Sequence, residues 1–503
     1  MRVLWIDDEI ELLNPYIYLL KERGYEVDTA ANGPDGLRLV TTKGYDLIFV
    51  DQMMPGVEGL AVVEAIKGFD PSAVIVMVTK LGEEELMEEA YSKLVDDFIV
   101  KPFSPHQIIS VVKRLLEKRK IITEKLTRDY LAFLREERNF NSFTEWRDYY
   151  LRLIRWRFLI ERFGEESLKE TLGDIQRQAN DDFACFVEEI YPSWLEGKEE
   201  PPLLSHKVFG NLLAPYLREK PLYFFIFDSM RLDQWYLLVP LLKEYFNIRQ
   251  FYYLSILPSA TPYSRNALLS GLLPLEIHTR YPNLWVFDEM GQNRYEKELL
   301  AKLLAQEKIG GPWFYLKATK SEDIEEQRGM LLRKDVRFAC IVVNFLDFLL
   351  HAARPAKPLE DILENESSFL QLTRTWFANS PFFEFIKELA NQDCRVIITT
   401  DHGFIKVKRP TIIFGDMEIS SNLRYKHGSA LRTEGRNALL VFPERLGLPK
   451  ASPDEKMAIA KSDFYFIYPT KPTQYERTYK FTYQHGGISL EEMILPLGIL
   501  EKR

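Results

Sequence analysis

The chain has 503 residues and a formal net charge of −9, with 65 Lys and Arg against 74 Asp and Glu. At roughly 100–200 residues per domain, this length predicts two to four domains. An apolar share of 46% and a charged share of 28% are typical of a globular protein rather than a disordered or fibrous one. The excess of acidic over basic residues, which is concentrated in residues 1–118, argues against a protein that binds duplex DNA through a broad basic surface.

Cysteine usage and apolar runs bear on the compartment. The chain has three cysteines and no CxxC pair, which argues against a disulfide framework and against a thiolate zinc site. The acidic start MRVLWIDDEIE lacks the basic-then-apolar layout of a signal peptide. No apolar run approaches the ~20 residues of a membrane span. We therefore expect a cytoplasmic protein.

Residues 1–118 alternate short apolar runs with helical patterns. The expected strands are Val3–Ile6, Glu26–Ala30, Asp46–Val50, Ala73–Val78 and Phe98–Val100. A further helix is expected at about Ser104–Lys118. Five such units predict a doubly wound, flavodoxin-like parallel sheet.

Charged and hydroxyl side chains stand at the ends of these strands. Asp7 and Asp8 follow the first strand, Asp51 the third, Thr79 the fourth and Lys101 the fifth. The carboxyl ends of strands in a doubly wound sheet open into one crevice, so these side chains are expected to converge. Three carboxylates crowded together need a cation, and an all-oxygen set suits Mg²⁺. The cation and Lys101 would neutralise charge on a phosphoryl group arriving at Asp51.

This region resembles the receiver domain of two-component response regulators. The matching features are the acidic pair, Asp51 with Pro55-Gly56 soon after, Thr79, Phe98 and Lys101-Pro102. The resemblance implies reversible phosphorylation of Asp51 by a sensor histidine kinase, with Mg²⁺ held by Asp7, Asp8 and Asp51. It further implies switch roles for Thr79, Phe98 and Lys101, and a dimer on phosphorylation.

Residues 119–204 change character, because strand signals vanish while Arg, Glu, Leu and aromatic residues recur at helical spacing. We expect a bundle of three or more helices, punctuated by Gly164, Gly173 and Pro192. A linker of composition GKEEPP, residues 197–202, marks its end. Residues 205–503 return to α/β alternation and form the third expected domain, with strands at Leu222–Phe227, Phe338–Val343, Arg395–Thr400 and Ala438–Phe442.

Asp and His recur at the strand ends of the third region. The candidate ligands are Asp228, Asp347, His351, Asp401, His402 and His485. Nitrogen and oxygen ligands in this proportion suit Zn²⁺ or Mn²⁺ better than Mg²⁺. Six ligands are too many for one tetrahedral ion and suit a pair, which could clamp a phosphoryl group and activate a hydroxyl nucleophile. Singly, each of these aspartates could instead cap a helix, and His402-Gly403 and His485-Gly486 could be turn residues.

The nucleophile candidate is Thr261, which follows a strand and opens an expected helix. Free backbone N–H groups there would meet a phosphate, and metal coordination would lower the pKa of the hydroxyl. Ser259 and Ser264 are alternative nucleophiles. Arg265 and Asn266 could bind phosphate or lie on a solvated helix face, and His427 is a candidate for substrate contact or an ordinary loop histidine.

Residues 205–503 resemble the PglZ-type branch of the alkaline phosphatase superfamily. The resemblance implies that Asp347, His351 and His485 hold one metal ion, that Asp228, Asp401 and His402 hold the other, and that Thr261 reaches toward both. Receiver, helical bundle and PglZ domain in this order resemble response regulators of type IX secretion. That resemblance implies a zinc-dependent phosphodiesterase acting on short linear or cyclic oligonucleotides.

Aromatic side chains that could stack bases are Tyr263, Tyr281, Trp285 and Tyr425. A basic cluster, Lys406, Lys408 and Arg409, could attract an anionic substrate or be a solvated loop.

Two other classes of function stay open. In the first, the metal domain is structural or vestigial and the output is a contact with a sigma factor or a secretion motor protein. In the second, the arginines of residues 147–162 form a DNA-binding helix. Aromatic and Leu residues interleave with those arginines, which favours a packed bundle with solvated arginines.

Overall fold

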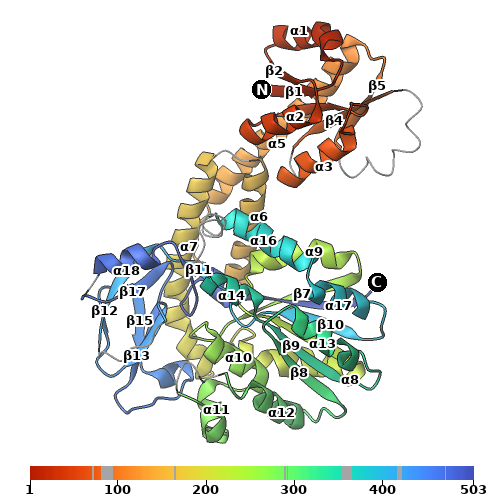
Figure 1. Ribbon diagram of the computed structural model, residues 1–503. Coiled ribbons are helices and arrows are strands. Elements are labelled where there is room, and N and C mark those ends of the chain that lie inside the picture. Colours follow the sequence, from red (N-terminus) through yellow and green to blue (C-terminus); the bar gives the residue numbers. More distant parts are fainter. Residues whose placement is uncertain are drawn as a thin grey trace. The chain divides into compact units, whose positions relative to one another are not determined.

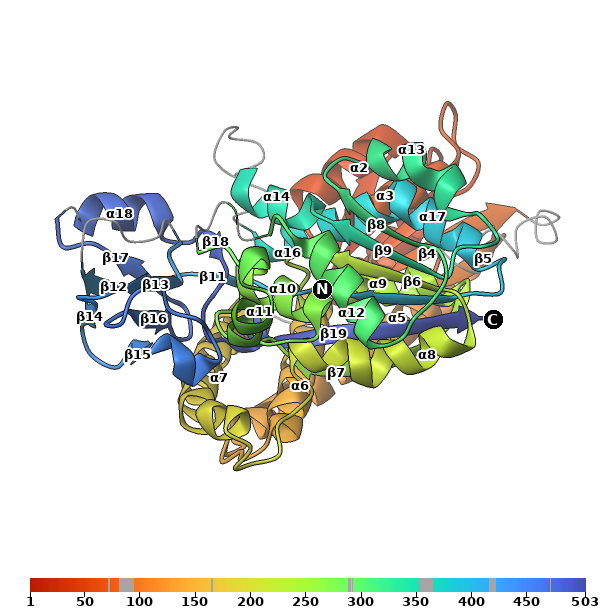
Figure 2. The same cartoon turned by 90° about the horizontal axis from the view of Figure 1, so that it is seen from below.

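A computed structural model describes residues 1–70, 73–80, 95–163, 166–287, 291, 293–352, 365–415, 422–470 and 472–503 (Figures 1 and 2). The chain divides into two compact units. The first comprises Met1–Glu136 with Trp156–Lys169, and the second Glu137–Arg155 with Glu170–Arg503. None of the described helices is both long enough and apolar enough to cross a membrane.

The first unit contains a parallel sheet with strand order β2-β1-β3-β4-β5. Its strands are β1 (Arg2–Ile6), β2 (Glu26–Ala30), β3 (Leu47–Asp51), β4 (Ile75–Lys80) and β5 (Asp97–Lys101). Its helices are α1 (Asn14–Glu22), α2 (Gly33–Thr42), α3 (Gly59–Phe69) and α5 (Pro105–Leu134). Alternate strand residues feed two separate apolar clusters, one on each face of the sheet. The doubly wound, flavodoxin-like prediction is therefore confirmed.

Helix α5 is longer than the sequence analysis predicts. Ser104 caps it, since its side chain accepts a hydrogen bond from Gln107 N while Gln107 Oε1 accepts one from Ser104 N at 2.7 Å. No Gly or Pro follows Pro105 within the helix, so nothing interrupts it near Lys118 and it ends only at Leu134. The expected boundary between residues 118 and 119 thus falls inside one continuous helix.

Two further long helices are α6 (Phe143–Phe163) and α7 (Glu166–Leu195). Gly173 and Pro192, expected as breaks, lie inside α7. Pro192 is close to the helix end, where the buried side chains of Tyr191 and Trp194 continue the packing across it. Gly164 lies outside the described residues.

The second unit is built on a six-stranded sheet with order β7-β19-β10-β6-β9-β8. Its strands are β6 (Leu222–Phe227), β7 (Phe246–Leu254), β8 (Trp313–Ala318), β9 (Phe338–Val343), β10 (Arg395–Thr399) and β19 (Ile494–Lys502). Strands β10, β6, β9 and β8 are parallel, whereas β19 is antiparallel to both of its neighbours. The carboxyl ends of β10, β6 and β9 therefore lie side by side at one edge of the sheet.

Helices cover both faces of this sheet (Figure 1). On one face of the sheet, an apolar cluster contains strand side chains together with side chains from the segment before β6 and from two helices that follow β7. The helices on that side are α8 (Ala214–Glu219), α10 (Thr261–Ser270) and α12 (Glu296–Gln306). Phe225 and Phe227 point to the other face, where they meet Phe385 and Phe377. The remaining helices that flank the sheet are α9 (Leu232–Lys243), α13 (Glu322–Leu331), α16 (Glu366–Ala378) and α17 (Pro381–Leu389).

A group of short strands follows β10. The sheets are β14-β12-β17 and β13-β16-β15, with a separate ribbon of β11 (Ile405–Lys406) and β18 (Tyr483–Gln484). Their other strands are β12 (Arg409–Phe414), β13 (Tyr425–Gly428), β14 (Arg432–Thr433), β15 (Ala438–Val441), β16 (Lys456–Ala460) and β17 (Phe464–Ile467). Helices α11 (Pro274–Arg280), α14 (Phe345–Ala352), α18 (Pro472–Tyr479) and α19 (Leu490–Met493) complete the unit.

Candidate metal centres

The first centre lies at the carboxyl edge of the five-stranded sheet. Carboxylate oxygens of Asp7, Asp8 and Asp51 lie within 4.8 Å of one another. Lys101 Nζ is 2.9 Å from Asp7 Oδ2 and 2.9 Å from Asp51 Oδ1. Thr79 lies within β4 beside Asp51 on β3, since Val78 pairs with Asp51. The all-oxygen donor set fits Mg²⁺, with Lys101 as a neighbouring cation.

The electrostatics of this centre follow from its burial. Burial raises the pKa of Asp51, the charges of Asp7 and Asp8 add to the effect, and Lys101 opposes it. Burial also disfavours the charged Lys101 ammonium, but its hydrogen bonds to Asp51 and Asp7 outweigh this and raise the pKa of Lys101. Phe98, the expected switch aromatic, is 55% exposed on β5. The peptide bond between Lys101 and Pro102 is cis.

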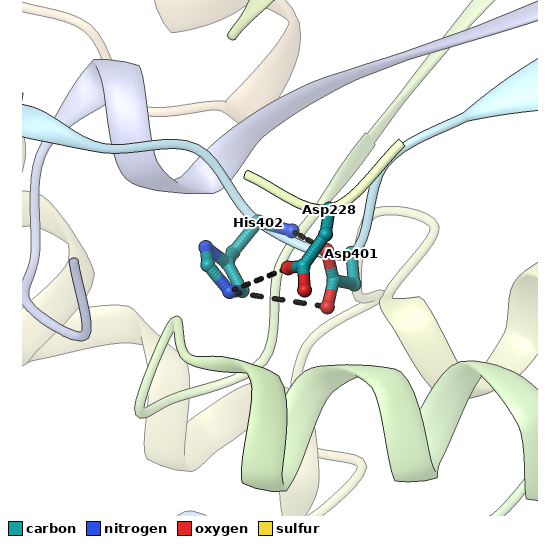
Figure 3. A group of neighbouring side chains, drawn as sticks. All are labelled: Asp228, Asp401 and His402. Carbon is teal, nitrogen blue, oxygen red and sulfur yellow. Dashed lines mark hydrogen bonds and ion pairs between the residues drawn. The ribbon is translucent and has the colours of Figure 1, made fainter. Parts of the chain in front are cut away.

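The second centre lies where β6 and β10 end. Asp228 directly follows β6, and Asp401 and His402 follow the neighbouring strand β10. Their ligand atoms lie within 4.8 Å of one another, and all three side chains are buried (Figure 3). His402 Nε2 is 3.7 Å from Asp228 Oδ1 and 3.8 Å from Asp401 Oδ2.

Asp347 and His485 adjoin this cluster. β9 ends at Val343, so Asp347 stands in the first turn of α14 rather than at the strand end. His485 follows β18, which pairs with β11 just after His402, and the two imidazole rings stack with centroids 4.4 Å apart. His485 Nε2 is 3.6 Å from Asp347 Oδ1. His351 lies on α14, but its side chain is outside the described residues.

Thr261 is the first residue of α10 and touches the cluster directly. Its hydroxyl lies 2.8 Å from His402 Nε2 and donates a hydrogen bond to Asp228 Oδ1 at 3.3 Å. The alternative hydroxyls are engaged elsewhere, because Ser259 donates to the Gly487 carbonyl and Ser264 to the Ala260 carbonyl. Among these three hydroxyls, Thr261 is the one within hydrogen-bond distance of the buried carboxylate and imidazole.

Arg265, one turn along α10, is buried behind the carboxylates. Its Nη2 is 3.0 Å from Asp228 Oδ2, and its Nε is 3.0 Å from Glu296 Oε1 and 3.5 Å from Asp401 Oδ2. Its Nη1 donates to Asn344 Oδ1 at 3.2 Å. Arg265 is therefore not on a solvated helix face, and its charge is directed at the aspartates.

The other two candidates for substrate contact also have protein partners. Asn266 is fully buried, and its Nδ2 donates to the Pro262 carbonyl at 2.9 Å. His427, on β13, has Nδ1 3.0 Å from Glu455 Oε1. In the basic cluster, Arg409 pairs with Asp181 at 2.6 Å.

Three of the aromatic side chains expected to stack on bases pack against one another in the structure. Tyr263 lies 5.5 Å from Tyr425 and 6.3 Å from Trp285 between ring centroids. The fourth, Tyr281, makes a cation–π contact with Lys302, whose ammonium lies 5.6 Å from the ring centroid. Tyr263, Trp285 and Tyr425 are buried, so their rings pack against one another and do not present a free face for stacking on bases.

Sequence reasoning missed two residues of this centre. Glu296, on α12, is a buried carboxylate that balances Arg265, and no local pattern distinguishes it from a surface glutamate. Ser229 has a positive φ of 64°, a conformation that usually favours Gly or Asn, and its hydroxyl donates to Asp347 Oδ1 at 3.0 Å. A backbone strained at a residue other than glycine is a common feature of functional sites.

The chemistry of the second centre fits divalent cations. Asp401 Oδ2 is buried and accepts no hydrogen bond from any described residue. Burial raises the pKa of Asp228 strongly, and although Arg265 opposes the shift, the charges of Asp401, Asp347 and Glu296 reinforce it. The carboxylates of this centre outnumber the single guanidinium of Arg265 that faces them. Carboxylate oxygens and imidazole nitrogens together form a donor set that suits Zn²⁺ or Mn²⁺.

Comparisons with known families cover most of the chain. A family model of the BREX system PglZ alkaline phosphatase-like domain matches residues 208–499. A model of the response regulator receiver domain matches residues 3–113, and one of the PorX response regulator linker domain matches residues 119–195. Both centres thus lie within matched regions.

Individual relatives align over about a quarter of the chain. The transcriptional regulatory protein ResD of Bacillus subtilis is 35% identical over 117 residues, 23% of this chain and 48% of ResD. SrrA of Staphylococcus aureus is 31% identical over 136 residues, 26% of this chain and 56% of SrrA. The chain therefore spans about half the length of these curated relatives. The solved receiver domain of NtrX from Brucella abortus shares 31% identity, covering 23% of this chain and 98% of that one, with a TM-score of 0.22.

Proposed function

This chain belongs to the PglZ alkaline phosphatase-like family and is a response regulator of the PorX type, and on that premise we propose that it is a phosphorylation-controlled phosphodiesterase. Its substrates are short linear or cyclic oligonucleotides, it acts in the cytoplasm, and its output serves type IX secretion. The single observation that carries the catalytic part is the Thr261 hydroxyl held between Asp228 and His402.

Two metal ions are part of this proposal. Asp347, His351 and His485 would hold one, and Asp228, Asp401 and His402 the other, with zinc favoured and manganese as the alternative. Bound there, such ions would polarise a phosphoryl oxygen and lower the pKa of a neighbouring hydroxyl. In the receiver, Asp7, Asp8 and Asp51 would hold Mg²⁺.

The chain's own residues supply the nucleophile and its orientation. The Thr261 hydroxyl loses its proton to solvent and its Oγ1 attacks phosphorus, so that the Oγ1–P bond forms as the bond to the leaving sugar oxygen breaks, and that oxygen takes up a proton and leaves as a sugar hydroxyl. Water then hydrolyses the bond between Thr261 Oγ1 and phosphorus, which releases the remaining nucleotide phosphate and restores the threonine hydroxyl. Asp228 Oδ1 accepts the hydrogen bond of the Thr261 hydroxyl and so orients it. Arg265 holds the other oxygen of Asp228, which supports an orienting role for Arg265 in place of direct phosphate binding.

The regulatory part rests on the receiver. A sensor histidine kinase phosphorylates Asp51, and the switch residues Thr79, Phe98 and Lys101 respond, which we propose leads to a homodimer. A sigma factor and a secretion motor protein are the proposed downstream partners.

The proposal is tested by turnover of bis-p-nitrophenyl phosphate with added Zn²⁺ or Mn²⁺. We expect the wild-type chain to turn it over and Thr261→Ala to fall to the background rate while still binding metal, because only the nucleophile is lost. Ser264→Ala, which removes a hydroxyl bonded to a backbone carbonyl on the same helix, is the matched control and should retain activity. Bound metal without Thr261-dependent turnover would instead favour a regulatory binding module.

A further inference from the structure

Helix α7 contacts the segment that follows His485. Asn180 Oδ1 accepts a hydrogen bond from Leu490 N at 2.8 Å, and Asn180 Nδ2 donates to Glu491 Oε2 at 2.9 Å. Gln176, one turn earlier, donates to the other oxygen of the Glu491 carboxylate. Asn180 is buried, so both of its polar groups act away from solvent. The start of α19 is therefore held to α7 through both main chain and side chain.

The same helix contacts the segment that precedes Thr261. The Tyr191 hydroxyl, fully buried three turns along α7, accepts a hydrogen bond from Leu257 N at 3.2 Å. Leu257 lies four residues before Thr261, in the short connection between β7 and α10. Ser259, in this connection, donates to the Gly487 carbonyl at 2.6 Å, which joins it to the His485 segment.

Contact continues from α19 to His402. Gly403 N donates to the Glu492 carbonyl at 3.1 Å. A Cβ on Gly403 would lie 1.9 Å from the Glu491 carbonyl oxygen, so the two backbones touch. Through Glu491 the helix thus reaches the residue beside His402.

We propose that α7 positions the metal centre, with Asn180 and Tyr191 as its two positioning residues. Asn180 sets where His485 and His402 lie, and Tyr191 sets where Thr261 lies, so one helix determines the separation between nucleophile and ligands. This inference rests on the proposed function for its catalytic consequence. Because Asn180 and Tyr191 face different segments, they affect different measured quantities.

A swap of partners tests the Asn180 contact in the full-length protein. Asn180→Asp sets a second carboxylate against Glu491, and we expect zinc affinity, measured by chelator competition, to fall about tenfold, as for other residues that orient ligands. The double variant Asn180→Asp with Glu491→Gln restores a donor opposite an acceptor and should recover zinc affinity. Arg177→Ala, on the exposed side of α7, should keep the wild-type affinity.

Tyr191→Phe tests the second contact. The change removes only the acceptor of Leu257 N, and we expect kcat for bis-p-nitrophenyl phosphate to fall about tenfold, since small displacements of a nucleophile are costly. KM and zinc affinity should not change, a split that general destabilisation would not produce.

Zinc affinity unchanged in Asn180→Asp, or not recovered in the double variant, overturns the inference. So does a Tyr191→Phe variant with wild-type kcat. If the wild-type protein binds zinc but does not turn over the substrate, only the proposed phosphodiesterase activity is contradicted. The zinc affinities of the variants still test whether α7 positions the ligands. If the wild type binds no zinc, amide hydrogen exchange of residues 485–491 decides: it must rise in Asn180→Asp and not in Arg177→Ala.

Discussion

At the scale of single residues, buried charges are paired around the candidate metal centre. Arg265 faces Asp228, Asp401 and Glu296, so one guanidinium offsets several carboxylates that would otherwise repel each other. A second buried pair, Arg424 and Glu492, orders the turn after His485, because Glu492 also accepts from Gly487 N at 2.8 Å. Removing one partner of such a buried pair typically costs about 3–5 kcal/mol, since the other charge is left uncompensated.

His206 leads to a prediction about pH. It lies in a short 3-10 turn, Ser205–Lys207, that packs against α10, and burial lowers its pKa to about 3. An unfolded chain binds this proton near pH 6.5, so the stability contributed by neutral His206 is complete above pH 6.5 and is lost as pH falls toward 3. Between pH 7 and pH 5 the wild type should lose about 2 kcal/mol more than His206→Gln.

Urea unfolding of both proteins at pH 7, 6 and 5 measures this difference. The carboxylates common to both chains cancel in the comparison, so parallel pH profiles would contradict the assignment of a neutral, buried His206.

At the scale of elements, the short β11–β18 ribbon joins the two histidine segments. Its pairing of Ile405 with Gln484 brings His402 and His485, which lie far apart in the sequence, into ring contact. The turn after His402 packs without a side chain at Gly403 against the backbone of α19. The ribbon and α19 together hold both imidazoles.

We predict that Gly403→Ala weakens zinc binding by about tenfold or more, because its Cβ would meet the Glu491 carbonyl oxygen and displace His402. Gly428→Ala is the matched control, since its Cβ would meet Leu431 at an ordinary 3.7 Å. Chelator competition measures both affinities, and circular dichroism checks that each variant is folded. Equal zinc affinity in the two variants would show that the Gly403 contact does not position His402.

At the scale of the whole molecule, a receiver and a PglZ domain share one chain with a linker whose helices are long and nearly uninterrupted. The proposed phosphorylation of Asp51 would add charge beside Lys101, which lies 2.9 Å from the Asp51 carboxylate, and the exposed Phe98 on β5 is part of the surface that we propose responds. The proposed outcome is self-association of the full chain.

We expect beryllofluoride with Mg²⁺, which imitates the acyl phosphate at Asp51, to double the mass of the wild-type protein in sedimentation. Asp51→Asn lacks the acceptor carboxylate and should stay at its original mass. An unchanged wild-type mass would count against control by dimerisation.

The sequence by itself determined the fold classes and the strand ends where chemistry gathers. Apolar runs followed at once by Asp, as at Asp51 and Asp228, are local signals, and parallel strands necessarily bring their carboxyl ends to one edge. The receiver, linker and PglZ predictions, which rest on resemblance to known families at these motifs, were confirmed by the family matches.

Only the tertiary structure decided which distant groups complete the centre. Glu296 and Ser229 carry no local signal, and strands β8 and β19 are recognisable only by their pairing, since strand formation depends on neighbours across the sheet. Likewise the contacts of Asn180 and Tyr191 span sequence separations that no periodicity encodes. Burial and long-range pairing, which arise only when the chain is folded, made Arg265 a partner of the aspartates and α7 a neighbour of Thr261 and His485.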